Sequence, residues 1–252
     1  MHLADLAQFR QAAYRLISSM LIYPEEERLR TVAAAAAGLL PESSVLAEFL
    51  FYPQWQRLLA CLAEVAGRRS LGEDYVRLFW HGSGAAPCLP YESVYADPNR
   101  QAAPWIMAML EDEYGQAGLT LSASVEPPDH IAVEMEFMAY LCCQEVEAWR
   151  EGNLAQGLVA MGRQLAFLDR HLIRWVPGWA VKVMEADTSG VYLVVAEAAR
   201  VFVLHDCDLI DVLLRRFKGL AKADHGETDF STAVRVSGTS DQELGGGQNA
   251  PS

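Results

Sequence analysis

The residue types best suited to chemistry or recognition lie in three short clusters between residues 75 and 130. The first cluster ends an expected helix, the second occupies a proline-bearing loop, and the third begins another expected helix. The candidate binding residues are Tyr75, Leu78 and Phe79 in the first cluster, Pro90, Tyr91, Glu92 and Tyr95 in the second, and Glu126, Pro127, Asp129 and His130 in the third.

The loop cluster has the chemistry of a peptide-recognition surface. Tyr91 and Tyr95 flank Glu92, and aromatic rings supply contact area at low entropic cost while a carboxylate can pair with arginine or lysine. A loop whose aromatic rings cover the core would have the same composition. Leu78 and Phe79 favour the core, whereas the Tyr75 hydroxyl, one turn earlier, is predicted to reach the surface beside the loop.

The third cluster also has a purely structural interpretation. Proline is pre-organised for the first turn of a helix, and Asp129 would there accept orphan backbone N–H groups. His130 gains nothing from the helix dipole, which favours a contact beyond the helix. It lies four residues before Glu134, the spacing of a salt link.

Catalytic and metal-binding motifs find little support. The chain has no GxSxG, P-loop or GxGxxG sequence. The run from His205 to Asp208 and the pair Cys142–Cys143 lack established ligand spacing, so we expect the two cysteines to be small core residues.

Composition restricts the class of partner. The net charge of −13 disfavours nucleic acid and anionic membrane surfaces, because no basic surplus replaces counterions. No secretory signal is visible at the amino terminus, and the apolar stretch 191–204 is too short to span a bilayer. Five cysteines without a CxxC pair favour a reducing compartment, which predicts a cytoplasmic protein.

Helical periodicity extends over most of the chain, and no run alternates with period two. The fold class is therefore predicted to be all-α, a bundle of about ten helices in residues 1–221, with a disordered polar tail over residues 222–252. We expect helices at 3–22, 25–38, 55–67, 71–79, 104–118, 128–149, from 158 to Pro177, 191–204 and 208–220, and an extended loop at 83–98.

Taken in order, the three clusters resemble the motifs of the TorD/DmsD family of redox-enzyme maturation chaperones, and more distantly those of NarJ-type chaperones. The resemblance covers roughly residues 6–215. It implies a helical, non-enzymatic cytoplasmic protein that binds the twin-arginine signal peptide and the apo-form of a molybdenum-cofactor oxidoreductase of the DMSO reductase family. Such a protein assists cofactor insertion before export, and the molybdopterin guanine dinucleotide belongs to the client.

The same resemblance implies that all of the candidate residues named above belong to the signal-peptide surface. A receptor for two arginines and an apolar segment needs carboxylates beside an apolar groove. We hypothesise that Asp129, with Glu92 or Glu126, meets the arginines. Tyr91, Leu78 and Phe79 would border the groove. Tyr75 stands where the family also has tryptophan, and the tail beyond residue 222 has no counterpart.

Two other functions stay open at this point. A NarJ-like chaperone would serve a membrane-anchored nitrate reductase that is not exported, and a small helical metal- or nucleotide-dependent hydrolase would belong to another class. The pattern also fits either a monomer or a dimer with exchanged segments, and it does not name the client enzyme.

Overall fold

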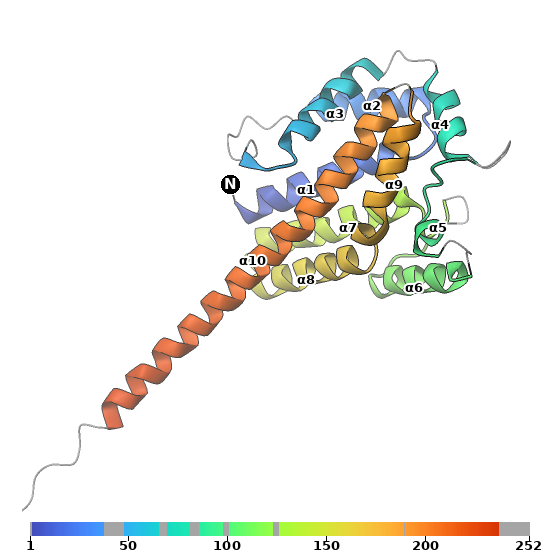
Figure 1. The fold of residues 1–252 in the computed structure, drawn as a ribbon. Helices are drawn as coiled ribbons and strands as arrows, with labels where there is room; N and C mark the ends of the chain where they lie inside the picture. The colour runs from blue at the N-terminus through green and yellow to red at the C-terminus, as the bar shows by residue number, and fades with distance from the viewer. Residues whose placement is uncertain are drawn as a thin grey trace, which may run out of the picture. The chain divides into compact units, whose positions relative to one another are not determined.

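The computed structural model describes residues 2–37, 48–65, 70–80, 86–97, 101–122, 126–188 and 190–236, with side chains through residue 219 (Figure 1). Contacts divide the chain into two units, Met1–Asp211 and Val212–Ser252. The described residues form helices and contain no strand, which confirms the all-α prediction. The helices are α1 (Leu3–Met20), α2 (Glu26–Ala37), α3 (Tyr52–Val65), α4 (Leu71–Phe79), α5 (Glu92–Ala96), α6 (Ala103–Gln116), α7 (Ile131–Arg150), α8 (Leu154–Arg170), α9 (Leu172–Ala186) and α10 (Val191–Val236).

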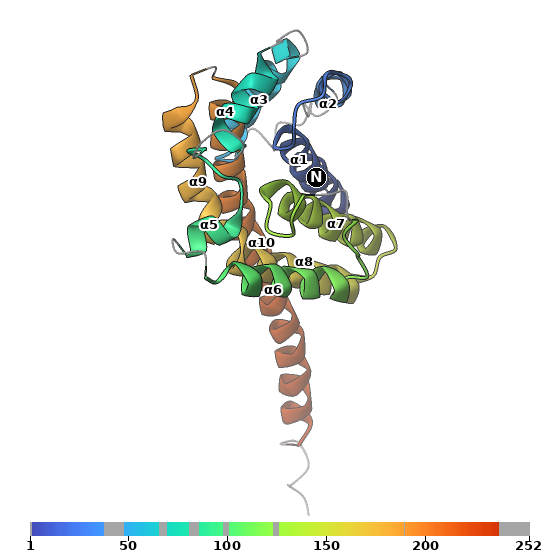
Figure 2. The same cartoon turned by 90° about the vertical axis from the view of Figure 1, so that its right-hand side faces the viewer.

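The centre of the first unit is the packing of α1 along α7, with α8 on another side of α7 (Figures 1 and 2). Ile17 of α1 and Met135 and Met138 of α7 are fully buried. The apolar residues of α7 cover a wide arc, so the helix must be surrounded on most sides. None of the described helices combines the length and apolar character needed to cross a membrane.

The start of α7 differs from the prediction. The helix was expected from Pro128, but it begins at Ile131. Residues 127–130 form a turn in which the His130 N–H donates to the Pro127 carbonyl at 3.0 Å. His130 is the N-cap, and its Nδ1 accepts the Ala132 N–H at 3.1 Å. The turn positions the third sequence cluster just before the most buried helix.

The prediction that Pro177 and Gly178 end a helix was wrong. The chain breaks at His171, whose backbone is not helical, and α9 then runs through Pro177. Proline removes one backbone hydrogen bond, but Trp175 and Trp179 on the same helix are buried. Their burial favours a continuous helix over the local preference of proline.

The two helices predicted at 191–204 and 208–220 are a single helix, α10. The helical backbone continues through His205, Asp206 and Cys207, and the Asp206 side chain accepts the Tyr14 hydroxyl in the core. The helix extends through residues 222–236, which were assigned to the predicted tail. Residues 237–252 lie outside the described residues, so the predicted disorder of that segment is not tested.

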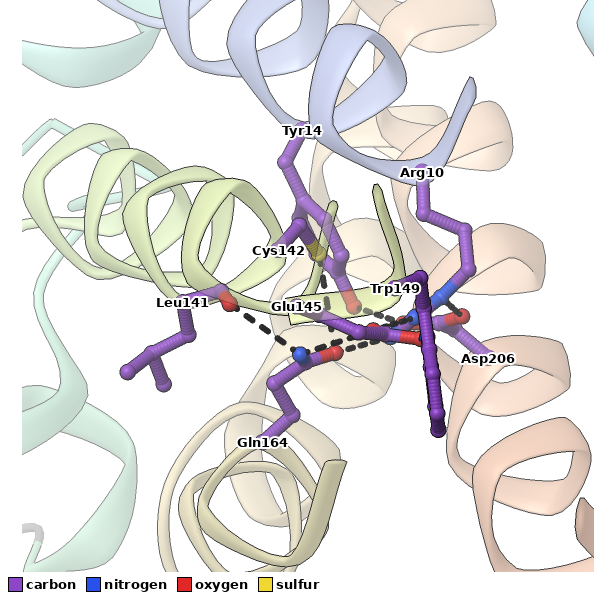
Figure 3. Close-up of polar contacts among 8 residues, drawn as sticks. All are labelled: Arg10, Tyr14, Leu141, Cys142, Glu145, Trp149, Gln164 and Asp206. Carbon is purple, nitrogen blue, oxygen red and sulfur yellow. Dashed lines mark hydrogen bonds and ion pairs between the residues drawn. The ribbon is translucent and has the colours of Figure 1, made fainter. Parts of the chain in front are cut away.

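A buried polar network joins α1, α7, α8 and α10 within the first unit (Figure 3). The Arg10 guanidinium donates to Glu145 Oε2 at 2.6 Å and also to Asp206 and Gln164. Tyr14 Oη donates to Asp206 Oδ2 at 2.7 Å. Only 1% of Arg10 is exposed, and such a charge is tolerated in a core only when it is paired and hydrogen-bonded.

Candidate peptide-binding site

Backbone hydrogen bonds bring the three sequence clusters together. The Cys88 N–H donates to the Leu78 carbonyl at 3.1 Å. The Ile131 N–H donates to the Pro90 carbonyl, and the Glu92 N–H to the Asp129 carbonyl, both at 2.9 Å. The last two bonds form an isolated antiparallel bridge between Tyr91 and His130. We call these contacts among residues 78, 88, 90–92 and 129–131 the motif junction.

Residues 92–96 form the short helix α5 and not the extended loop that was predicted. Asp129 Oδ2 accepts the Ser93 N–H at 3.3 Å, so this carboxylate contacts the first turn of α5. Asp129 was expected to cap its own helix or to meet an arginine of the ligand. Asp129 is 2% exposed. Its hydrogen bond to Ser93 instead joins the third cluster to the second.

The first cluster belongs to the core. Leu78 and Phe79 are buried as expected, and Phe79 packs edge-on against Tyr75 and Tyr192. The prediction of a surface hydroxyl on Tyr75 was wrong, because Tyr75 is also buried and its hydroxyl points to the Leu21 carbonyl at 3.5 Å. Burial, followed by the negative charge of Glu126, raises the pKa of Tyr75 well above its usual value.

His171 links α5 to α6, a contact that the sequence did not reveal. Its Nδ1 lies 2.8 Å from Glu92 Oε2 and its Nε2 lies 3.3 Å from Glu113 Oε1. Burial by itself would lower the pKa of His171, but hydrogen bonds to Glu113 and Glu92 outweigh it and raise the pKa. Burial opposes the ionisation of Glu113, yet hydrogen bonds from His171 and Arg170 lower its pKa. The carboxylate of Glu92, which was predicted to bind the ligand, is therefore already hydrogen-bonded to His171.

Glu134 and His130 do not form the predicted salt link. Burial lowers the pKa of His130 to about 3, so the imidazole is neutral. Burial and then the charge of Glu92 raise the pKa of Glu134. Trp175 Nε1 donates to Glu134 Oε2 at 3.2 Å, while Oε1 has no hydrogen-bond partner within the described part of the chain. The side chains of His130 and Glu134 are therefore both part of the buried interior next to the motif junction.

An open groove lies between α1, the end of α6 and the first half of α7, with a volume of about 440 Å³. This volume is within the range of about 300–1,000 Å³ that is typical of ligand sites. We call it the α1–α7 groove. It is lined by Arg15, Ser18, Ser19, Ile22, Tyr114, Leu119, Leu121, Glu126, Ala132, Val133, Glu136, Phe137 and Tyr140.

The α1–α7 groove has an apolar wall and two carboxylates. Val133, Phe137 and Tyr140 form a stripe along α7 at helical spacing, and Tyr140 Oη donates to the Ala117 carbonyl at 3.0 Å. Glu136 Oε1 lies 3.7 Å from Arg15 Nε, and both side chains are more than half exposed. That pair is weak because solvent screens it. The groove can therefore bind an apolar segment that carries a positive charge.

The predicted binding residues separate into two groups. Tyr91, Tyr95 and Glu126 are partly exposed and Pro127 is exposed, while the other seven are buried. Glu126 also lines the α1–α7 groove. The binding role of all eleven residues stays a prediction. Val133, Phe137 and Tyr140 were not among the predicted site residues; their helical spacing along α7 was the available signal.

Metal binding finds no structural support in the described residues. They contain no group of three or more His, Cys, Asp or Glu side chains that could hold an ion. Within residues 205–208, which were considered above as a metal site, the Asp206 carboxylate accepts hydrogen bonds from Arg10 and Tyr14. Cys142 is buried beside Gln164, in agreement with its prediction as a core residue. The same prediction was wrong for Cys143, which is only partly buried.

Comparisons with known proteins place these features in a family context. The family model described as "Nitrate reductase delta subunit" matches residues 50–181, which is half of the chain. The chain is 30% identical over 148 residues to the chaperone protein TorD of Vibrio cholerae, covering 58% of this chain and 64% of that protein. It is 31% identical over 164 residues to the chlorate reductase assembly chaperone of Ideonella dechloratans, covering 62% and 80%.

The fold has a counterpart among solved structures. A crystal structure described as that of a redox enzyme maturation protein from Archaeoglobus fulgidus aligns with a TM-score of 0.51 and 23% identity. The alignment covers 77% of this chain and 93% of that one. The chain spans about 64% of the length of the curated relatives that it matches first. The matched family model, the relatives and the three clusters agree: the chain belongs to the nitrate reductase delta subunit family, among the TorD-type redox-enzyme maturation proteins.

Proposed function

We propose that the protein is an assembly chaperone for the catalytic subunit of a molybdoenzyme of the DMSO reductase family. It binds the twin-arginine signal peptide and the apo-form of this client in the cytoplasm and assists cofactor insertion before export. The molybdopterin guanine dinucleotide is carried by the client. The names of the relatives, which are chaperones and not catalysts, support the general role.

The observation that carries the peptide-binding part of the proposal is the position of Glu126. This motif residue lines the α1–α7 groove, whose remaining surface is mainly apolar. A twin-arginine signal peptide combines two cationic side chains with an apolar segment. The groove offers both complements, because carboxylates pair with guanidinium groups and an apolar wall binds an amphipathic or apolar segment.

Within this proposal the clusters have different roles. Glu126, together with Glu136, meets the arginines, and Val133, Phe137 and Tyr140 bind the apolar part. The buried residues of the motif junction support the groove from behind, since Asp129 and Glu92 are engaged with Ser93 and His171. Pro127, which directly follows Glu126 in the chain and is exposed, borders the groove.

Co-purification tests the chaperone role. The tagged protein is isolated from its host and the bound proteins are identified by mass spectrometry. We expect a molybdoenzyme catalytic subunit that retains its uncleaved twin-arginine leader. A leaderless nitrate reductase subunit would favour the NarJ-like function. Absence of any molybdoenzyme, under conditions in which one is expressed, would contradict the proposal.

Peptide titration tests the site. A labelled twin-arginine signal peptide is titrated with the wild-type chain, with Leu121→Gln and with the double variant Glu126→Gln/Glu136→Gln. We expect each to weaken binding about tenfold, since roughly 1.4 kcal/mol corresponds to that factor. The matched controls are Leu154→Gln, an exposed leucine outside the groove, and Glu151→Gln/Glu185→Gln, which removes the same charge elsewhere. Equal losses in variants and controls would contradict the groove assignment.

A further inference from the structure

A second depression lies between α6, α7 and α8 and has a volume of about 300 Å³ (Figure 2). We call it the α6–α8 hollow. Phe137 and Leu141 of α7 and Val159 of α8 line it, and Val159 is 56% exposed. Phe137 also lines the α1–α7 groove, and the Tyr140 hydroxyl in that groove donates to the carbonyl of Ala117, which lines the hollow. The groove and the hollow are therefore neighbours along α7.

The α6–α8 hollow has an unpaired cation at its edge. Arg163 is exposed and lines the hollow, and its guanidinium forms no hydrogen bond or ion pair in the described part of the chain. Glu147 and Glu151 share an adjoining depression with Arg163, but neither forms an ion pair with it. Arg170, the other arginine of the hollow, lies 2.9 Å from Glu113 and is already paired. Arg163 is therefore available to an anionic group of a ligand.

Gly162 leaves the α6–α8 hollow open. It lies inside α8 and lines the hollow, and a Cβ atom added there would meet nothing within 4 Å. Glycine inside a helix is unfavourable relative to alanine, and no close neighbour requires it at this position. Gly157 on the same helix differs, because its added Cβ would lie 2.5 Å from the Trp149 ring. The absence of a side chain at residue 162 keeps the apolar floor accessible.

The groove and the hollow offer opposite charges beside apolar surface. The α1–α7 groove carries the carboxylate of Glu126, and the α6–α8 hollow carries the guanidinium of Arg163. We propose that the hollow binds the client chain where it continues beyond the apolar part of its signal peptide, with an apolar side chain on the floor and a carboxylate at Arg163. A guanidinium suits this role because its N–H donors pair with a carboxylate in a defined geometry. The inference rests on the proposed function, because it assigns the next segment of the same client to a neighbouring site.

Occupation of both sites by one chain has a consequence for affinity and selectivity. Once the signal peptide is held in the α1–α7 groove, the following segment binds at a high effective concentration and raises the overall affinity. The contribution of Arg163 weakens with salt, since the charge is exposed and screened. Clients that share a twin-arginine motif but differ in the residues after the apolar segment are therefore bound with different affinities.

The first test compares three labelled peptides on the full chain. One is a twin-arginine signal peptide that ends with its apolar segment, the second adds Gly-Ser-Leu-Ser-Glu-Ser-Gly-Ser, and the third has glutamine in place of that glutamate. Eight extended residues span at most about 28 Å, so the extension can reach beyond the groove. We expect the second peptide to bind about tenfold more tightly than the first. It should bind about threefold more tightly than the third at low salt, because an exposed ion pair contributes little.

Variants of the hollow separate its charge from its shape. Arg163→Gln should abolish the preference for glutamate over glutamine, and Gly162→Leu should fill the hollow and abolish the whole gain from the extension. Both variants should bind the unextended signal peptide as the wild type does, since neither residue lines the α1–α7 groove. The matched controls are Arg174→Gln, at an exposed arginine of α9, and Gly178→Leu, at an exposed glycine of α9 whose added Cβ also meets nothing within 4 Å.

The outcomes distinguish this inference from the proposed function. Equal affinity of the wild type for all three peptides would overturn the inference and leave the proposed function intact, whereas binding of none of them would count against both. A gain that persists in Arg163→Gln and Gly162→Leu would also overturn the inference. A benzophenone cross-linker in place of the leucine of the extension locates the segment directly. We expect it to attach within α6, α7 or α8, and attachment to any other helix would contradict the assignment.

Discussion

The indole ring of Trp149 on α7 lies directly against the backbone of Gly157 on α8. A Cβ atom added at Gly157 would sit 2.5 Å from two ring carbons. The ring cannot move freely, because its Nε1 donates to Glu145 Oε1 at 2.9 Å and Glu145 also holds Arg10. This close approach fixes the distance between two helices beside the buried polar network.

Replacement of Gly157 by alanine should therefore destabilise the protein. Alanine is favoured over glycine inside a helix by about 1 kcal/mol, but overpacking costs about 1–3 kcal/mol, and the contact distance makes the second effect larger. Gly162→Ala on the same helix is the control, since nothing lies within 4 Å of its added Cβ. Chemical denaturation should show a lower free energy of unfolding for Gly157→Ala and a higher one for Gly162→Ala. A higher value in both would show that the Trp149 ring can shift to accommodate the added methyl group.

Removal of Arg10 should have one of the largest effects on stability of any single substitution. Arg10→Ala leaves Glu145 and Asp206 buried without their cation, and breaking a buried pair costs about 3–5 kcal/mol. Arg15→Ala on the same helix removes an exposed partner 3.7 Å from Glu136, which should cost less than about 1 kcal/mol. Urea unfolding of the two variants checks the difference, and similar losses would contradict a structural role for the network.

The pH dependence of stability should contain a contribution from His171. Its pKa is raised in the folded state, so its contribution is complete below the unfolded value of about 6.5 and is lost as pH rises through the folded pKa. Glu113 has the opposite sign, because its pKa is lowered and its contribution is lost as pH falls below about 4.5. We expect the free energy of unfolding of the wild type to decline above neutral pH relative to that of His171→Gln. Parallel curves would exclude the histidine as the cause.

Asp129 distinguishes support of the site from contact with the ligand. Asp129→Asn keeps an oxygen that can accept the Ser93 N–H, whereas Asp129→Ala removes it. We expect alanine to cost about 1 kcal/mol, as for loss of a helix cap, and asparagine to cost much less. Signal-peptide affinity should be unchanged in Asp129→Asn if Glu126 meets the arginines. A tenfold loss of signal-peptide affinity in that variant, with stability preserved, would show that Asp129 contacts the peptide directly.

The helices and the family could be predicted from the sequence because both depend on local patterns. Apolar residues at helical spacing define α1, α7 and most other helices wherever a single face is buried. The three clusters retain their order and spacing, which carried the resemblance to the TorD/DmsD family. The apolar face of α7 that lines the groove was also visible as a period, although its exposure was not.

Only the tertiary structure decided which polar groups meet. Arg10 pairs with Asp206, 196 residues away, and His171 with Glu92, 79 residues away, and no local pattern specifies such partners. The same limit explains why Asp129 contacts α5 and not its own helix, and why α9 passes through Pro177. Periodicity states which face of a helix is buried, but burial against distant helices determines whether a charge there is paired, neutral or available to a ligand.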